Sequence, residues 1–538
     1  MRVHETVART LADLGTDTLF GLMGDANMLY VADFQGMPGH SYVGAVGEGA
    51  AVSMADGFAR VSGRVGVCTV THGPGATNMI TSLTEAVRAR TALIVLTGDT
   101  PAAARDHVQR VDLAAVAHVA QASYRKVSRA EDLQDELIRA FEQAGRGVPV
   151  VVNIPVDFML EEIDPAPVTT HVRMVSDQVL SQSDELDNAL GLIASARRPL
   201  VIAGRGAGHA ETAIVRLADL LGAPLGTSLL GKGLFTDHPC HLGVIGSVGH
   251  EVAIDATVAA DVVISFGAGL NHFTTSEGSL FDGCKVVQCD IEPTRFGQMR
   301  HADVEIVGDA RFTATFLADA IAAADLGRTT DWSDTIARRL AARDPLAGVT
   351  EHPSPGTVDM RSVMHAVNTM LPADRTVVTD CGRFMLAPWQ LLSVESPRAF
   401  THTVSFGSIG LGLATAIGAS VANRSRITVV VGGDGGAMMS MIEFQTAVRL
   451  GLPLVFIVLN DGSYGSEYER LEHYGVDPRF SLLEWPSFAE IARAMGGHAM
   501  TVAAMDELDE LERVVAGQQL PVLVEVVADP SVDIGSVR

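Results

Sequence analysis

The chain has 538 residues, and a length of this order predicts about three domains of roughly 100 to 200 residues each. Hydrophobic residues make up 47% of it and charged residues 19%, a balance that excludes a disordered chain and favours a well-packed enzyme. The formal net charge of -25 argues against a nucleic-acid partner, because phosphate binding needs clustered Lys and Arg side chains.

The compartment is predicted from the N-terminal segment, the apolar runs and the cysteines. Residues 1–15 form an amphipathic helical pattern without the apolar core and cleavage site of a signal peptide. No apolar run reaches the roughly 18 to 20 residues that a membrane span needs. The five cysteines form no Cys-x-x-Cys pair, so neither a disulfide framework nor a structural zinc site is indicated. We expect a cytoplasmic protein with no membrane partner.

Helical patterns alternate with short β-branched runs along the chain, which is typical of parallel sheets covered by helices. Two breaks interrupt the alternation, a Pro- and Thr-containing stretch at 164–171 and a polar, Pro-bearing stretch at about 323–356. We therefore predict an α/β protein of three doubly wound parallel-sheet domains at 1–165, 180–325 and 356–530. The predicted strands are 65–70, 92–97, 148–154, 198–204, 260–267, 285–291, 376–379, 427–432, 454–459 and 522–526.

The first and third predicted domains share a weak internal similarity. Each contains a glycine turn, then a helix, then a buried strand, at 73–98 in the first domain and at 433–460 in the third. Two related α/β units in one chain favour a functional site built between them.

The segment 429–465 carries the clearest motif. A β-run ends in a Gly-Asp-Gly turn around Asp434, a helix of about 14 residues is expected to follow, and a second apolar strand ends in Asn460-Asp461. Both strand ends belong to the carboxyl edge of a parallel sheet, so Asp434 and Asp461 should meet there. Two carboxylates, a backbone carbonyl and phosphate oxygens suit Mg²⁺. The N–H groups expected to bind the phosphates are those of Gly435, Gly436 and Ala437.

This motif by itself predicts a metal-held diphosphate and no particular reaction. The alternative for Asp434 is a carboxylate that only caps the following helix. Two more segments bear on the choice. Glu48 follows a predicted strand at 42–46 and opens a helix of small residues, which it could merely cap. Ile409 lies between glycines in the segment 405–412, just before a second small-residue helix, and could be an ordinary core residue.

Together these segments resemble the motifs of thiamine diphosphate (TPP) enzymes. The resemblance implies that Asp434, Asp461 and the carbonyl of Ser463 hold Mg²⁺. It also implies that Glu48 hydrogen-bonds the aminopyrimidine ring of TPP and promotes the imino tautomer that generates the reactive ylid.

In the same resemblance Ile409 is the apolar wedge that bends the cofactor, and the carbonyl of Gly407 accepts a hydrogen bond from its amino group. Asp461 stands where many relatives have a second Asn, and Gly47 stands where they commonly have His. The other residues expected to contact the cofactor are Gly382, Arg383, Gly433, Gly435, Gly436, Ala437, Tyr464 and Gly465.

The order of the domains resembles that of the acetolactate synthase, pyruvate oxidase and 2-oxo acid decarboxylase group, and the resemblance covers nearly the whole chain. Members of this group build each site from two subunits, which implies a homodimer or homotetramer.

Four residues are expected to line the substrate pocket. His72 occupies the Ser position of an acetolactate synthase segment, where benzoylformate decarboxylase has His, and such a histidine can relay protons at neutral pH. Asp25 belongs to a Gly-Asp-x-Asn turn similar to that of pyruvate and indolepyruvate decarboxylases. Gln109 resembles a pocket residue of acetolactate synthase, and His272 lies near a second histidine of benzoylformate decarboxylase. The alternatives are a turn residue for His72 and a helix cap for Asp25.

The resemblance implies a TPP- and Mg²⁺-dependent decarboxylase or carboligase that acts on 2-oxo acids and is similar to acetolactate synthase. The alternatives are a benzoylformate-type non-oxidative decarboxylase, an FAD-dependent enzyme similar to pyruvate oxidase, and a TPP-binding protein without turnover. The segment 267–272 lacks the Arg-Phe-Asp-Asp run associated with flavin and substrate carboxylate binding, which argues against FAD, although FAD remains among the alternatives.

Overall fold

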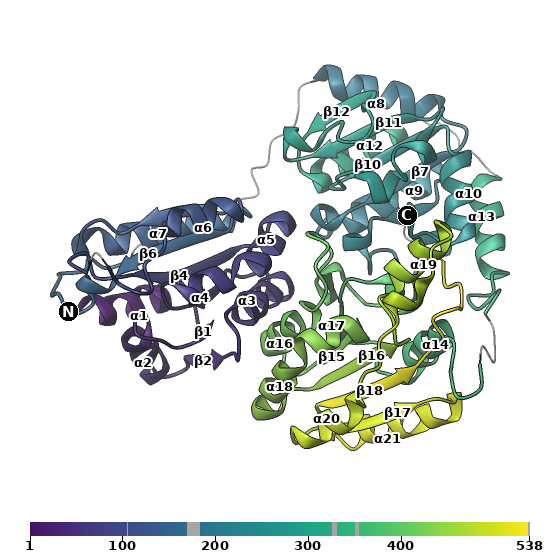
Figure 1. The fold of residues 1–538 in the computed structure, drawn as a ribbon. Coiled ribbons are helices and arrows are strands. Elements are labelled where there is room, and N and C mark those ends of the chain that lie inside the picture. Colours follow the sequence, from purple (N-terminus) through teal and green to yellow (C-terminus); the bar gives the residue numbers. More distant parts are fainter. Residues whose placement is uncertain (105, 169–182, 325–330, 350–353, 536–538) are drawn as a thin grey trace.

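The computed structural model describes residues 1–104, 106–168, 183–324, 331–349 and 354–535. These residues form three six-stranded sheets, one in each predicted domain, and all the strand pairs within them are parallel (Figure 1). Neighbouring residues on a strand pack into different apolar clusters, as Val429 and Val430 do, so both faces of a sheet are covered. The predicted α/β class is confirmed. Parts of the predicted breaks at 164–171 and 323–356 lie outside the described residues.

The N-terminal sheet has the order β2-β1-β3-β4-β6-β5. Its strands are β1 Thr18–Gly21, β2 Ser41–Gly44, β3 Gly66–Thr69, β4 Leu93–Asp99, β5 Ser123–Lys126 and β6 Val150–Pro155. The helices are α1 Val3–Asp13, α2 Met28–Gly36, α3 Glu48–Ser62, α4 Pro74–Asn78, α5 Ile80–Ala89, α6 Leu113–Val119 and α7 Leu133–Gly145.

The middle sheet has the order β12-β11-β10-β7-β8-β9, so the strand order reverses between β7 and β10. Its strands are β7 Pro199–Ala203, β8 Leu225–Thr227, β9 His241–Val244, β10 Val262–Phe266, β11 Lys285–Asp290 and β12 Val304–Val307. The helices are α8 Ser183–Ser195, α9 Glu211–Leu221, α10 Glu251–Ala259, α11 His272–Thr275, α12 Ala310–Ala323 and α13 Trp332–Ala341.

The C-terminal sheet, β14-β13-β15-β16-β18-β17, repeats the strand order of the first, in line with the internal similarity of the sequence. Its strands are β13 Arg375–Thr379, β14 Phe400–His402, β15 Ile427–Gly433, β16 Leu454–Asn460, β17 His498–Val502 and β18 Val522–Val527. The helices are α14 Met360–Met370, α15 Leu386–Leu391, α16 Gly412–Ala422, α17 Asp434–Ser440, α18 Phe444–Leu450, α19 Gly465–His473, α20 Phe488–Ala494 and α21 Asp509–Ala516.

The helix expected after the Gly-Asp-Gly turn is divided. A 3₁₀ turn at Met441–Glu443 separates α17 from α18. At this turn the buried carboxylate of Glu443 accepts hydrogen bonds from the N–H groups of Val46 (2.8 Å) and Gly47 (3.0 Å). The interruption therefore joins the C-terminal domain to the loop that precedes α3.

Helices α3 and α16 form the main contact between the first and third domains (Figure 1). They run antiparallel, since Gly57 faces Thr415 while Gly418 faces Met54. A Cβ atom on Gly418 would lie 1.8 Å from the Met54 carbonyl oxygen, and one on Gly57 would lie 2.0 Å from that of Thr415. The small residues that mark both helices in the sequence thus let the two backbones touch.

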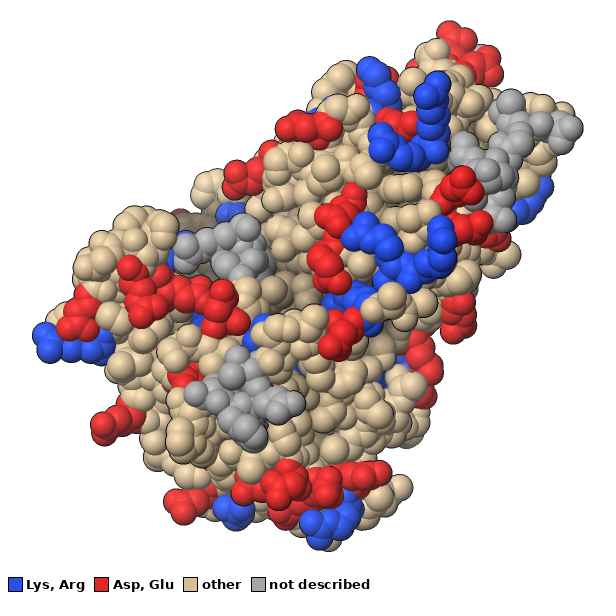
Figure 2. All heavy atoms as spheres, turned by 90° about the vertical axis from the view of Figure 1, so that its right-hand side faces the viewer, with Lys and Arg blue, Asp and Glu red and all other residues tan. Residues whose placement is uncertain are grey.

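In the part of the chain that the structure describes, no helix combines the length and the apolar composition that a membrane span needs. On the face drawn in Figure 2, basic and acidic side chains lie interspersed. Exposed ion pairs also join helices of the middle domain, as Arg339 of α13 and Asp255 of α10 do at 2.6 Å.

Candidate active site

The carboxyl edge of the C-terminal sheet brings Asp434 and Asp461 together. Strands β15 and β16 are parallel neighbours, and each aspartate directly follows one of them. Asp434 is buried, and its carboxylate accepts hydrogen bonds from the backbone N–H of Gly435 (2.9 Å) and from the indole N–H of Trp485 (3.0 Å). The two carboxylates that the sequence singles out therefore share one site.

Burial, together with the nearby charge of Asp461, raises the pKa of Asp434 to about 6. Burial also raises the pKa of Asp461. Two adjacent carboxylates in a desolvated position repel each other when both are ionised. A divalent cation between them removes that repulsion, which is the electrostatic environment that Mg²⁺ needs.

Ser463 completes the set of oxygen donors. Its backbone N–H and its hydroxyl both donate to Oδ1 of Asp461, at 3.0 Å and 2.7 Å. This closes the turn after β16 and fixes the Ser463 backbone beside the carboxylates. The donors at the site are all oxygen atoms, which fits the predicted magnesium ligands Asp434, Asp461 and the carbonyl of Ser463.

Glycines are sterically required at the start of α17 and α19. A Cβ atom on Gly435 would lie 2.6 Å from the Tyr464 ring, and one on Gly436 would lie 2.6 Å from a carboxylate oxygen of Asp380. Ala437 follows on the same helix and is buried. Gly465 is equally confined, because a Cβ atom there would lie 2.7 Å from the Arg383 side chain. The missing side chains therefore let Tyr464, Asp380 and Arg383 pack directly against these backbones.

Arg383, which the sequence assigns to cofactor contact, is held by the protein itself. It pairs with Glu469 at 2.7 Å and with Asp461 at 3.5 Å, and it donates to the carbonyl of Pro530 at 2.7 Å. Arg383 therefore connects the Asp461 carboxylate to the C-terminal segment. Gly382 precedes it, against the ring of Phe384.

Asp380 anchors the segment around Ile409, and sequence reasoning missed it. It is buried at the end of β13, where it accepts hydrogen bonds from Gly410 N–H (2.7 Å) and from the Thr403 hydroxyl (2.9 Å). Burial raises the pKa of its carboxyl group. Gly407 and Gly410 have φ angles of 77° and 86°, which only glycine adopts readily, and Ile409 between them is partly exposed.

Glu48 is the first residue of α3, after an extended Gly47 at the N-cap. Its carboxylate is partly exposed and accepts a hydrogen bond of 3.1 Å from the side chain of Asn78, at the end of α4. The carboxylate therefore projects towards the α4 end of the domain instead of closing back on its own helix.

One chain alone does not bring Glu48 to the Ile409 segment. Glu48 lies at the end of α3 that Glu443 contacts, whereas Arg60, near the other end, donates to the His402 carbonyl at 2.7 Å. The twelve residues from Glu48 to Arg60 span about 18 Å of helix. The two halves of the predicted site therefore lie at opposite ends of the α3–α16 pair.

Asp25, His72 and Gln109 gather at the carboxyl edge of the N-terminal sheet. His72 is buried, and its ring centroid lies 5.7 Å from that of His107, a residue to which the sequence gave no role. Burial lowers the pKa of His72 and His107 lowers it further, while Gln109 and Asp25 act in the opposite direction. His107 in turn accepts a hydrogen bond on Nδ1 from the N–H of Gln109, at 3.2 Å.

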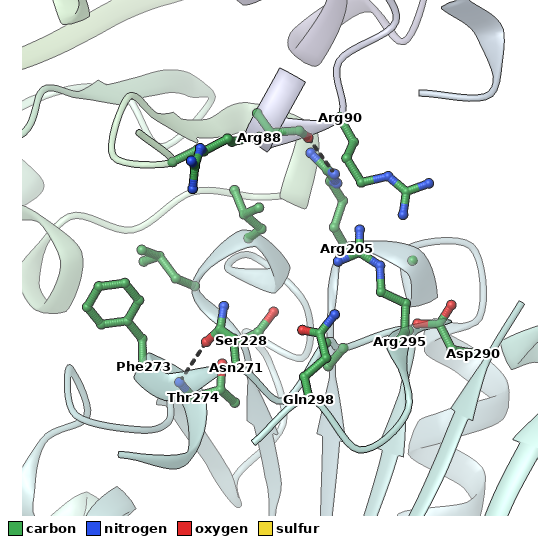
Figure 3. Close-up of a pocket in the computed structure, with 18 of the residues that line it drawn as sticks. Arg88, Arg90, Arg205, Ser228, Asn271, Phe273, Thr274, Asp290, Arg295 and Gln298 are labelled. Carbon is green, nitrogen blue, oxygen red and sulfur yellow. Dashed lines mark hydrogen bonds between the residues drawn. The ribbon is translucent and has the colours of Figure 1, made fainter. Parts of the chain in front are cut away.

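His272 lies elsewhere. It begins α11 in the middle domain, with its ring centroid 3.8 Å from that of Phe273, and it lines a separate cavity of about 540 Å³. All three domains contribute to this cavity (Figure 3). The structure therefore groups three of the four residues expected in the substrate pocket. The fourth, His272, lines a different cavity.

The cavity is rich in arginine. Arg88 and Arg90 reach it from the N-terminal domain, and Arg205 and Arg295 reach it from the middle domain (Figure 3). Arg205 opens into the cavity but is surrounded by protein, and this burial lowers its pKa to about 10. Sequence reasoning could have placed Arg205 in the turn after β7. It could not have shown that three domains meet there, because no local sequence pattern indicates contacts between domains.

Three family profiles match the chain in order. They are described as thiamine pyrophosphate enzyme, N-terminal TPP binding domain, over residues 1–122; central domain, over residues 186–318; and C-terminal TPP binding domain, over residues 380–526. Thiamine pyrophosphate is another name for thiamine diphosphate.

Curated relatives match over almost the full length. A probable acetolactate synthase large subunit of Methanocaldococcus jannaschii is 29% identical, across 99% of this chain and 92% of the relative. The acetolactate synthase isozyme 2 large subunit of Escherichia coli is 29% identical, across 98% and 96%. A sulfoacetaldehyde acetyltransferase of Alcaligenes xylosoxydans xylosoxydans is 30% identical, across 94% and 89%.

Proposed function

The chain belongs to the thiamine pyrophosphate enzyme family, as a TPP-dependent enzyme related to acetolactate synthase and sulfoacetaldehyde acetyltransferase, and we propose that it decarboxylates a 2-oxo acid with the aid of Mg²⁺. The observation that carries the proposal is the buried pair Asp434 and Asp461 beside Ser463, with pKa values raised by burial and, at Asp434, by the neighbouring charge. A divalent cation between the two carboxylates would relieve their repulsion, and a diphosphate would supply it with further oxygen ligands.

The chain supplies binding, orientation and proton handling. Asp434, Asp461 and the Ser463 carbonyl would hold Mg²⁺, and the backbone N–H groups of Gly435 and Gly436 at the start of α17 would face the diphosphate. When bound, TPP supplies a carbon nucleophile and an electron sink for the pair of electrons left by CO₂. Asp380 fixes the segment that presents Ile409 and the Gly407 carbonyl. Glu48 would hold a proton at the pyrimidine ring nitrogen.

The reaction after decarboxylation depends on the cluster of His72, Asp25 and Gln109. Since burial and His107 lower the pKa of His72, this ring is neutral at pH 7, and its Nδ1 has no hydrogen-bond partner within the described residues. A neutral imidazole beside a carboxylate can pass a proton to a reacting carbon or to a carbonyl oxygen. This supports release of an aldehyde, as in a benzoylformate-type decarboxylase, alongside carboligation of the acetolactate synthase kind.

The test is a substrate screen. Purified enzyme with TPP and Mg²⁺ is offered pyruvate, benzoylformate and branched 2-oxo acids, and CO₂ release and product identity are scored. The proposal expects CO₂ from at least one acid, with an aldehyde, an acyloin or an acetohydroxy acid as the second product. If no 2-oxo acid is decarboxylated while TPP binds, the chain is a TPP-binding protein without this turnover.

We also propose that the working enzyme is a homodimer or a homotetramer. Glu48 and the Ile409 segment lie a helix length apart, so a second copy is needed to place one beside the other. Apolar side chains near these two ends are exposed in the single chain: Met439 at 61%, Ile442 at 53%, Val46 at 46% and Phe406 at 45%. A second copy that covers them would complete both sites.

Mixing two inactive variants tests this shared site. Glu48→Gln and Asp434→Asn impair different halves, so a mixed dimer contains one site with both changes and one site with neither. Co-expression followed by separation of the mixed dimer on two affinity tags should restore about half of the wild-type activity per dimer. A mixed dimer as inactive as its parents would contradict the shared site.

For the middle domain we propose a phosphate-bearing nucleotide, of which FAD is one. The cavity flanks the point where the strand order reverses between β7 and β10, which is where doubly wound sheets bind nucleotides. Its arginines suit a diphosphate, and Asp290 at the end of β11 is placed like a carboxylate that binds ribose. Absorbance of the purified enzyme near the flavin bands distinguishes FAD from a colourless nucleotide.

A further inference from the structure

The C-terminal half of α5 contacts both the arginine-rich cavity and the segment that carries Ile409. Glu85, in this half of the helix, is buried, and its carboxylate accepts a hydrogen bond of 2.7 Å from the backbone N–H of Phe406. The same carboxylate pairs with Arg60 at 3.2 Å. Phe406 is therefore fixed at its backbone, three residues before Ile409.

Arg88, one helical turn after Glu85, contacts both the Phe406 ring and the cavity. Its guanidinium carbon lies 5.4 Å from the centroid of the Phe406 ring, a cation–π contact, and its side chain also lines the cavity. Figure 3 shows Arg88 at the N-terminal-domain side of the cavity. A group that binds Arg88 in the cavity thus acts directly on the side chain that holds the Phe406 ring.

The residues after Arg88, at the C-terminal end of α5, also line the cavity. The Ala89 carbonyl accepts a hydrogen bond of 3.3 Å from Arg205, and Arg90 pairs with Glu292 of the middle domain at 2.5 Å. The cavity lining also includes His402, Val404 and Ser405, which lead directly into Phe406. The cavity wall and the Ile409 segment are therefore one continuous stretch of chain, supported from the side by α5.

We propose that a nucleoside diphosphate group bound in this cavity and TPP bound at the Ile409 segment strengthen each other's binding, with Arg88 and Phe406 carrying the coupling. This inference rests on the proposed function, because it takes both ligands from there. An anion held by Arg88 and Arg205 fixes the guanidinium over the Phe406 ring and so restricts the loop of Gly407 to Gly410. A loop that is already ordered costs less free energy to order again when TPP binds.

The experiment is a linkage measurement by calorimetry on the full-length enzyme in Mg²⁺. The dissociation constant of TPP is measured without nucleotide, with saturating ADP and with saturating FAD. We expect ADP to tighten TPP binding about fivefold or more, and TPP to tighten ADP binding by the same factor, because coupling between two sites is reciprocal. The FAD arm tells whether the flavin adds to the effect of the shared diphosphate.

Two variants, Arg88→Leu and Phe406→Leu, each remove one partner of the cation–π contact. The coupling factor is the ratio of the TPP dissociation constants without and with ADP, and in each variant it should fall close to one. Arg146→Leu is the matched control, because Arg146 lines the same cavity from the end of α7. It should weaken ADP binding while the coupling factor stays at the wild-type value. Arg88→Lys, which keeps the charge and stacks less well, should give an intermediate factor. Thermal melts of each variant verify the fold.

The outcomes separate this inference from the proposals beneath it. If TPP and ADP both bind with a coupling factor of one, or if Arg88→Leu keeps the wild-type factor, the coupling through Arg88 is wrong and the proposed function stands. If neither ADP nor FAD binds, the cavity proposal and the coupling are both overturned. If TPP itself does not bind, the proposed function is overturned.

Discussion

At the scale of single residues, the site depends on carboxylates placed where water is scarce. Asp434, Asp461, Asp380 and Glu85 are each held by several hydrogen bonds or by ion pairs within the protein. A buried carboxylate without such partners would shift its pKa until it became neutral. The raised pKa of Asp434 therefore marks a charge that the protein alone only partly compensates, and that a bound cation would complete.

Asp434→Asn is expected to separate stability from function. The pKa of Asp434 is raised from 3.8 to about 6, so the folded chain binds this proton more tightly than the unfolded chain. The contribution to stability is present below pH 3.8 and is lost as the pH rises through about 6. At pH 7 without metal, the Asn variant should be more stable than the wild type by about 1 to 3 kcal/mol.

Thermal melting with and without ligands checks this prediction. Mg²⁺ with TPP should raise the melting temperature of the wild-type enzyme and leave that of Asp434→Asn unchanged, because the variant lacks the metal carboxylate. Chelation with EDTA should reverse the wild-type shift. An Asn variant that is less stable than the wild type at pH 7 without metal would mean that the charge at position 434 stabilises the fold.

Glu48→Gln tests the proton step. Gln keeps the shape of the side chain and its hydrogen bonding with Asn78 but cannot hold the proton. We expect the rate of CO₂ release to fall at least about 100-fold, as for loss of a general acid–base group. TPP affinity, measured by calorimetry, should change little. Unchanged turnover in this variant would remove Glu48 from the mechanism.

At the scale of elements, two helices with small residues determine how the first and third domains meet. Gly418→Ala adds a Cβ atom 1.8 Å from the Met54 carbonyl oxygen, so α3 and α16 must separate. We expect a loss of about 1 to 3 kcal/mol in the free energy of unfolding. Gly191→Ala is the control, because Gly191 lies in α8 with no atom within 4 Å of its Cβ position. That change should stabilise by up to about 1 kcal/mol. Urea denaturation measures both, and equal effects would contradict the close packing.

The sequence predicts these elements well where the signal is local. The β-branched runs 427–432 and 454–459 coincide with β15 and β16, because buried parallel strands need uniformly apolar residues. The 3₁₀ turn at Met441–Glu443 was missed, since it depends on the contact of Glu443 with the loop before α3, nearly 400 positions earlier in the chain.

The site residues, too, were found where the sequence signal is local and were mostly missed where it depends on distant contacts. Asp434 and Asp461 were found because each directly follows one of two neighbouring strands, whereas Ser463 was found only through the family resemblance. Asp380 and Trp485 were missed, although Asp380 also directly follows a strand at the same edge. His107 and Arg88 could not be found from spacing, because their neighbours come from other turns of the chain or from other domains.

At the scale of the whole molecule, three similar α/β domains divide the work. The first and third domains carry the two halves of a TPP site, and the middle domain contributes most of the cavity in which an anion is expected. Because the halves lie at opposite ends of the α3–α16 pair, activity should depend on assembly. Light scattering should show a dimer or tetramer, and dilution to a monomer should abolish turnover. An active monomer would contradict the shared site.

We propose that this chain uses TPP to decarboxylate a 2-oxo acid. The most direct measurement is the release of CO₂ from pyruvate, benzoylformate and branched 2-oxo acids by apoenzyme that is stripped with EDTA and then reconstituted. Turnover of at least one acid should require TPP and Mg²⁺ together, and Glu48→Gln should abolish it. Absence of CO₂ from every acid, in an enzyme that demonstrably binds TPP and Mg²⁺, would contradict the claim.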